Sequence, residues 1–124
     1  MKDPSNPVCR TISTLLSRIG DKWTVLVVQT LGSGSKRFNE LRREIPAVSQ
    51  RMLTLTLRNL ERDGLVNRTV TPSIPPRVDY ELTELGQSLL TPICGLASWA
   101  MDNVEAIHLA QARFDTQHDA AEAA

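Results

Sequence analysis

The stretch SQRMLTLTLRNLERDGLV, residues 49–66, constrains the fold more than any other part of the chain. From Leu53 to Leu57 its leucines alternate with polar residues, which is typical of a half-buried strand. The same leucines continue to Leu60 at spacings of four and three, which is typical of a helix. Gly64 falls in phase with the stripe only on a helix. We therefore predict a helix over about residues 49–63, with a capping serine before it and a glycine stop after it.

The predicted helix has two chemically different faces. At about 100° per residue, Leu53, Leu57 and Leu60 cluster within roughly 60°, whereas Leu55 lies about 200° from Leu53. The face around Leu55 also carries Gln50, Arg51, Thr54 and Arg58. Arginine and glutamine side chains can pair with base edges, and threonine or leucine can touch a thymine methyl. On an isolated helix plain solvent exposure would be the better explanation of such residues, so the neighbouring elements must decide.

A second, shorter helix precedes this one. The segment FNELRREI, residues 38–45, places Phe38, Leu41 and Ile45 on one face. Pro46 ends it, and a four-residue turn leads to Ser49. Two amphipathic helices joined by so short a turn predict a helix-turn-helix.

Two strands follow the predicted helix-turn-helix. Apolar and polar residues alternate over 66–70 and again over 78–82. Between them TPSIPP carries three prolines, which cannot donate hydrogen bonds to a sheet, so this segment is expected to be a projecting loop. A hairpin in this position predicts a wing over about residues 66–82, and the chain as a whole predicts a mainly α fold with a small β-hairpin, a winged helix-turn-helix.

Helices are also predicted at both ends of the chain. One ends at Gly20, and Asp21 is expected to cap the next, largely apolar helix, which stops before GSGS at residues 32–35. From Thr83 a long apolar stripe runs to Ile107, with either a kink or a junction of two helices near Pro92. A small winged helix cannot cover such a stripe, which suggests packing on a second copy. We expect one domain over residues 1–114, dimerisation helices at about 9–19 and 83–112, and a flexible tail at 115–124.

The charge distribution points to a polyanionic partner. The net charge is zero, yet residues 36–77 hold nine basic and four acidic side chains, a net of +5, and the remainder is −5. A basic middle within a neutral chain is what a nucleic-acid footprint would look like, although chance clustering would give the same count. Arg77 is expected at a phosphate or in the minor groove, and lysine and arginine side chains of residues 36–43 at phosphates. The predicted DNA-contacting set is Ser49, Gln50, Arg51, Thr54, Leu55, Arg58, Arg77, Lys36, Arg37, Arg42 and Arg43.

Catalytic and metal-binding patterns are missing from the sequence. Two cysteines, Cys9 and Cys94, and two late histidines do not have metal-ligand spacing, and GSGS lacks the lysine and spacing of a phosphate-binding loop. We therefore expect no enzyme, no metal and no cofactor. No apolar run approaches the roughly 18 residues of a membrane span, and the first residues do not look like a signal peptide, so we expect a cytoplasmic, nucleoid-associated protein with no membrane partner.

Three segments resemble the HxlR-type family of bacterial winged-helix transcription regulators. They are IGDKWTVLVVQTL (19–31), KRFNELRREIPAVSQRMLTLTLRNLERDGLVNRTV (36–70) and PPRVDYELTELGQSL (75–89). The resemblance covers roughly residues 9–100. It implies a homodimer held by the first and last helices on a palindromic operator, with the recognition helix beginning at Ser49 and the wing tip at residues 71–77.

The same resemblance implies a role for Cys9. Many members of the family have a cysteine shortly before the GxKW motif, and several use it to sense electrophiles or oxidants. Cys9 occupies that place, although here proline precedes the cysteine and Arg10 follows it. A helix start and a neighbouring arginine favour a thiolate. Cys9 is equally explained as a small apolar residue in the dimer seam, and Cys94 is expected to pack in the core or interface, as are Trp23 and Trp99.

Taken together, these observations predict a sequence-specific DNA-binding regulator, a repressor of nearby genes that responds to an oxidant through Cys9. Two alternatives remain. The first is a winged-helix module that binds an acidic protein and no DNA. The second is a regulator that responds to a small molecule in the dimer seam.

Overall fold

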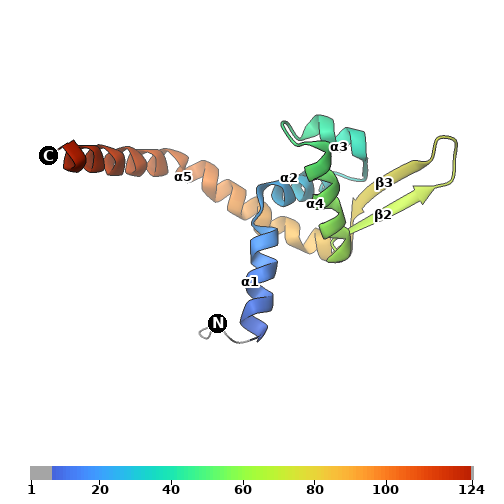
Figure 1. The fold of residues 1–124 in the computed structure, drawn as a ribbon. Helices are drawn as coiled ribbons and strands as arrows, with labels where there is room; N and C mark the ends of the chain where they lie inside the picture. Colours follow the sequence, from blue (N-terminus) through green and yellow to red (C-terminus); the bar gives the residue numbers. More distant parts are fainter. Residues whose placement is uncertain (1–6, 124) are drawn as a thin grey trace. The chain divides into compact units, whose positions relative to one another are not determined.

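The computed structural model describes residues 7–123, and the chain divides between Thr91 and Pro92 into two compact units. Within the described residues there are five helices and three short strands, and Figure 1 shows their arrangement along the chain. In chain order they are α1 (Pro7–Ile19), α2 (Lys22–Leu31), β1 (Lys36–Arg37), α3 (Phe38–Glu44), α4 (Gln50–Arg62), β2 (Val66–Thr71), β3 (Arg77–Leu82) and α5 (Glu84–Ala123). The predicted winged helix-turn-helix is confirmed.

The first unit contains a small antiparallel sheet of order β1-β3-β2. β2 and β3 pair along their whole length, from Val66 opposite Leu82 to Thr71 opposite Arg77. Residues 72–76 therefore lie outside the ladder, as their prolines predicted, and the hairpin extends away from the helices of this unit (Figure 1). The extended piece at Lys36 also pairs, with Tyr80 of β3, which adds a third strand to the predicted hairpin.

The helices of the first unit share one apolar core. Leu53, Leu57 and Leu60 of α4 are each at most 2% exposed. They are joined by buried residues of α2, of α3 and the residue after it, and of the strands and the residue before β2, namely Val27, Val28, Leu31, Leu41, Ile45, Leu65, Val66 and Leu82. The helical phase predicted for residues 49–63 is therefore the observed one, because a strand would have buried Leu55 together with Leu53 and Leu57.

Both ends of α4 are capped as its sequence predicts. The Ser49 hydroxyl accepts a hydrogen bond from the Met52 N–H at 3.0 Å. At the other end Gly64 has a φ of +77°, a conformation that side chains disfavour. The N–H of Leu65 bonds the Leu60 carbonyl at 2.9 Å, and the N–H of Gly64 bonds that of Glu61 at 3.1 Å, which together form a Schellman motif.

The capping role predicted for Asp21 is wrong. Asp21 is the N-cap residue of α2, but its carboxylate accepts no capping hydrogen bond. The junction with α1 is tight, because the Asp21 N–H still bonds the Arg18 carbonyl at 3.3 Å. The Asp21 carbonyl accepts from Val25 at 3.1 Å, while its side chain lines a groove.

Helix α5 differs from its prediction in two respects. It is one unbroken helix with Pro92 inside, so the alternative of two separate helices is wrong, whereas a kink there stays a prediction. A proline removes only one backbone donor, which a long helix can tolerate. The helix also continues beyond residue 112 to Ala123, because the alanines near its end favour helix. The single domain over 1–114 and the flexibility of 115–124 stay predictions.

Candidate nucleic-acid interface

The exposed face of α4 gathers most of the predicted base-contacting residues. Leu55 is 51% exposed, and the predicted polar residues beside it are exposed as well. A hollow of about 570 Å³ on this face is lined by Gln50, Arg51, Thr54, Leu55 and Arg58. Five residues predicted from sequence to face away from the core thus line a single concave surface.

The hollow offers hydrogen-bond donors around an apolar centre. The structure records no ion pair to Arg51 or Arg58 within residues 7–123. Thr54 donates its hydroxyl hydrogen to the Gln50 carbonyl at 2.8 Å, so it can offer a ligand its methyl group and an acceptor lone pair. Two guanidinium groups, one amide and the Leu55 side chain together match the donors and apolar groups that the major groove accepts.

Ser49 has a different role from its neighbours. Its oxygen already caps α4 through the Met52 N–H, so its first contribution is to begin the helix at this point. The start of a helix also presents free backbone N–H groups that attract phosphate. Ser49 therefore caps α4, and a contact with the DNA backbone stays a prediction.

Helix α3 carries a second basic surface. Arg42 and Arg43 are exposed in its last turn, and with Asn39 they line a hollow of about 510 Å³. Neither arginine has an intramolecular ion pair among the described residues. Both guanidinium groups are thus available for phosphate contacts.

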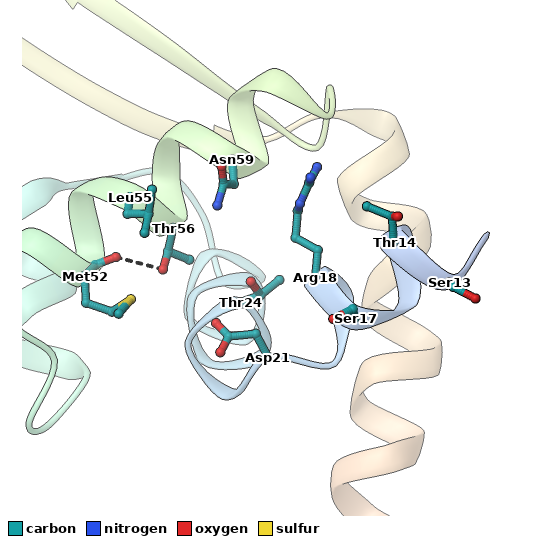
Figure 2. Close-up of a pocket in the computed structure, with 10 residues that line it drawn as sticks. All are labelled: Ser13, Thr14, Ser17, Arg18, Asp21, Thr24, Met52, Leu55, Thr56 and Asn59. Atoms are coloured by element: carbon teal, nitrogen blue, oxygen red, sulfur yellow. Dashed lines mark hydrogen bonds between the residues drawn. The ribbon is translucent and has the colours of Figure 1, made fainter. Parts of the chain in front are cut away.

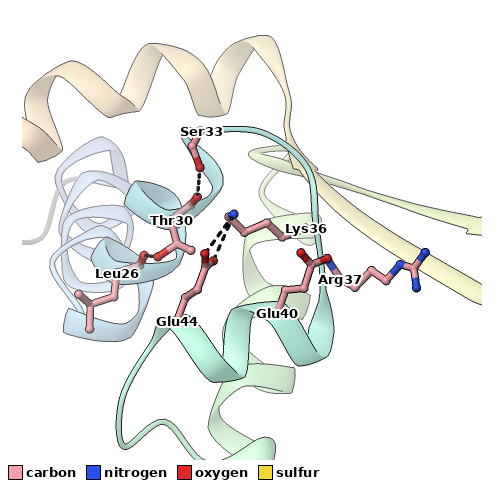
Figure 3. Close-up of polar contacts among 7 residues, drawn as sticks. All are labelled: Leu26, Thr30, Ser33, Lys36, Arg37, Glu40 and Glu44. Atoms are coloured by element: carbon pink, nitrogen blue, oxygen red, sulfur yellow. Dashed lines mark hydrogen bonds and ion pairs between the residues drawn. The ribbon is translucent and has the colours of Figure 1, made fainter.

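Lys36 and Arg37 are partly committed within the protein. The Lys36 ammonium lies 3.2 Å from a Glu44 carboxylate oxygen, and its side chain is only 17% exposed. The backbone N–H of Arg37 donates to Glu40 at 3.0 Å, and its guanidinium extends away from that carboxylate (Figure 3). Arg37 can therefore reach a phosphate freely, whereas Lys36 would first have to leave Glu44.

The wing contributes Arg77, the first residue of β3. Its Nε lies 2.9 Å from the Asp79 carboxylate, and its side chain is 52% exposed. The remaining guanidinium N–H groups of Arg77 have no other recorded hydrogen-bond acceptor among the described residues. Arg77, the residue predicted to contact DNA from the wing, is thus held by the Asp79 carboxylate.

Sequence analysis did not include Arg68 of β2 among the DNA contacts. Arg68 is exposed and lines a hollow of about 340 Å³ together with Arg58 and Tyr80. The only sequence signal for Arg68 was its place in the basic segment. That β2 lies beside α4 cannot be predicted from the local sequence pattern. Arg68 extends the basic surface from the recognition helix toward the wing.

Comparison with known proteins agrees with this geometry. Residues 18–108 match the HxlR-like helix-turn-helix family. The chain belongs to this family. An HTH-type transcriptional regulator of Methanothermobacter thermautotrophicus is 48% identical over 89 residues, which cover 72% of this chain and 68% of the relative.

Two solved structures similar to this chain are those of a redox regulator and of a protein treated with diamide. The redox regulator HypR in its reduced form has a TM-score of 0.73 and 41% identity, covering 79% of this chain and 97% of HypR. Diamide-treated YodB from B. subtilis has a TM-score of 0.66 and 35% identity, covering 78% of this chain and 96% of YodB. The predicted family and fold are both confirmed.

The cysteines of this HxlR-like chain lie in different environments. Cys9 is a half-buried free thiol in α1, and Cys94 is an exposed free thiol in α5. The prediction that Cys94 packs in the core is wrong, because its position on α5 is exposed in the single chain; packing in an interface stays a prediction. Trp99 is likewise 57% exposed, whereas Trp23 is half-buried with the Lys22 ammonium 4.5 Å from its ring centre.

Among residues 7–123, histidine, cysteine and acidic side chains form no group of three or more that could hold a metal ion. Within the same part of the chain, no helix has the length and apolar character needed to cross a membrane.

Proposed function

We propose that this HxlR-like protein is a sequence-specific, double-stranded DNA-binding transcription regulator whose helix α4 enters the major groove. The observation that carries the proposal is the hollow lined by Gln50, Arg51, Thr54, Leu55 and Arg58, directly opposite the buried leucines. In a helix-turn-helix the second helix reads base edges while the surrounding residues hold the backbone.

The phosphate contacts are assigned to residues around α4. Arg42 and Arg43 on α3 and Arg37 before it are exposed, and Arg77 lies at the base of the wing loop. Such contacts set the position of the protein on the duplex and carry no sequence information, whereas α4 supplies the specificity. We assign Arg77 to the minor groove or its phosphates, and Lys36 to a weaker contact because it is paired with Glu44.

A homodimer is the second part of the proposal. In α5, Leu96 is 60%, Trp99 57% and Val104 42% exposed, which is more apolar surface than a monomer normally leaves uncovered. A second copy of α5 supplies the matching apolar face. Two recognition helices related by twofold symmetry read a palindromic operator.

Regulation follows from occupancy of that operator. A dimer bound at a promoter blocks transcription, so we propose a repressor of nearby genes that acts in the cytoplasm, where prokaryotic DNA lies. No catalytic role, cofactor or metal is part of the proposal.

We assign the sensing of oxidants to Cys9. Its free thiol lies on α1, and the similar protein HypR is described as a redox regulator. A thiol that changes charge or forms a disulfide in a dimerisation helix would alter the spacing of the two recognition helices. A small effector in the dimer seam is the alternative.

Retardation of a fragment from the protein's own promoter at several salt concentrations tests the DNA-binding proposal. Neutralising several phosphates releases counterions, so the affinity is expected to fall steeply with salt, with a slope close to the number of contacts. A protein that binds an acidic partner through the same face would leave the promoter fragment unshifted at all salt concentrations.

A further inference from the structure

An ion pair joins the end of α1 to the end of α4. The Arg18 Nη1 lies 2.6 Å from Asp63 Oδ1 and 2.7 Å from Oδ2. The side chains are only 26% and 17% exposed. Such short, charge-assisted and partly buried bonds are stronger and less screened by salt than an ordinary surface pair.

The pair lies beside an open groove, which Arg18 helps to line. A groove of about 720 Å³ is lined by residues of α1, the start of α2, and α4, including Ser17, Arg18 and Asn59. Figure 2 shows Arg18 extending from α1 toward the half of α4 that carries Asn59. Because a groove separates the two helices here, close apolar packing does not fix their spacing. The ion pair fixes the spacing instead.

The residues that follow Asp63 are also held. Thr83, just before α5, donates its hydroxyl to the Gly64 carbonyl at 2.6 Å and its N–H to the Leu65 carbonyl at 3.0 Å. The three residues 63–65 therefore form a junction between α1, α4 and the first turn of α5. A displacement of α1 reaches the recognition helix at this junction.

We propose that the Arg18–Asp63 ion pair couples the position of α1 to that of α4 and thereby sets operator affinity. Both are positioning residues, acting through α4 rather than on DNA. Cys9 lies on the same helix, nine residues before Arg18 and about 13 Å along its axis. The link to DNA affinity rests on the proposed function, whereas the coupling of the two helices does not.

The direction in which one substitution changes operator affinity distinguishes an effect of positioning from an effect of charge alone. Asp63→Asn keeps a residue suited to a helix end but removes the partner of Arg18. Losing a negative charge close to DNA should by itself tighten binding, whereas loss of positioning weakens it. We expect the full-length variant to bind a duplex of its own promoter at least roughly fivefold more weakly, the lower end of typical coupling.

Glu61→Gln is the matched control, because Glu61 lies two residues before Asp63, is exposed, and has no recorded ion pair within residues 7–123. It should bind as well as the wild type or slightly better. The double variant Arg18→Asp/Asp63→Arg restores the pair with reversed polarity, so in the DNA-free protein it should slow amide exchange in the last turns of α1 and α4 relative to Arg18→Asp alone. Thermal unfolding of each variant shows whether the proteins compared are folded at the assay temperature.

Hydrogen exchange in the DNA-free protein gives a readout independent of function. With coupling, Asp63→Asn speeds amide exchange in the last turns of both α1 and α4, and Glu61→Gln does not. If the wild type binds its promoter and Asp63→Asn binds equally well or more tightly, the inference is wrong and the proposed function stands. If the wild type does not bind, the proposed function fails, and exchange alone decides the coupling: an unchanged α1 overturns it.

Discussion

Leu55 and Leu57 are two residues apart on α4 and lie on opposite sides of it: Leu57 is 2% exposed and Leu55 is 51% exposed. Leu57 packs α4 into the core, and Leu55 lies at the centre of the outer face of α4. The hollow around Leu55 is lined by two arginines, a glutamine and a threonine, so an apolar contact would be surrounded by hydrogen-bonding groups. The placement of these two leucines explains why the sequence alternates without forming a strand.

Leu55→Ala should weaken operator binding by on the order of 1 kcal/mol and relax the preference at one base pair, because a thymine methyl loses its partner. Affinities for a set of single-base operator variants measure this. The free energy of unfolding should stay nearly unchanged. Leu57→Ala provides the contrast, with a loss of stability of roughly 2–5 kcal/mol from the cavity it leaves. A loss of stability without a change in base preference would show that Leu55 packs within the protein and does not contact a base.

Two substitutions at Ser49 separate its capping role from its place near DNA. Ser49→Ala removes the acceptor for the Met52 N–H and should cost about 1 kcal/mol of stability. Ser49→Asp keeps an acceptor and should preserve stability, yet it places a negative charge beside the DNA backbone and should weaken operator binding. Denaturant unfolding and operator titration of both variants check this. Equal affinities for the aspartate variant and the wild type would place the start of α4 away from phosphate.

Gly86→Ala should destabilise the protein by several kcal/mol. A Cβ on Gly86 would meet the Leu65 carbonyl oxygen closer than real Cβ atoms approach, and both are backbone positions that cannot move independently. Gly95, also in α5, has nothing within 4 Å of such a Cβ, so Gly95→Ala should be neutral or stabilising by up to about 1 kcal/mol. Thermal unfolding of the two variants gives the comparison, and similar melting temperatures would contradict the tight approach of α5 to residue 65.

Cys9→Ser should bind the operator as the wild type does but no longer respond to diamide, because the hydroxyl cannot form a disulfide or a sulfenic acid. Cys94→Ser removes the other, exposed thiol and should keep the response. Operator titrations before and after diamide treatment of each variant measure it. A full response in Cys9→Ser would transfer sensing to Cys94 or to a seam ligand.

Much of this fold could be predicted from local patterns. The helical phase of α4, its serine cap and its glycine stop depend on residues within one helix, and these predictions were confirmed. The outward face followed from the same phase, so the residues that line the hollow could be named in advance. The basic segment added the surrounding arginines.

What could not be predicted depends on contacts between distant residues. The Arg18–Asp63 pair joins positions 45 residues apart, and Arg68 comes next to Arg58 only through the pairing of β2 beside α4. Asp21 lies at the N-cap position as predicted, but its side chain makes no capping hydrogen bond and lines a groove with residues of α1 and α4. The apolar stripe of α5 was recognised, yet its partner is a matter of assembly and not of local sequence.

The central claim is that the outer face of α4 reads DNA, and operator affinity of the double variant Arg51→Ala/Arg58→Ala tests it most directly. Each bidentate arginine contact to a guanine is worth about 1–3 kcal/mol. We therefore expect the variant to lose at least about 2 kcal/mol of binding free energy, roughly thirtyfold in Kd, while its stability stays unchanged. Lys22→Ala/Arg113→Ala removes the same charge from exposed residues outside the basic segment and should lose far less. Unchanged affinity of the Arg51/Arg58 variant, or an equal loss in the control, would contradict the account.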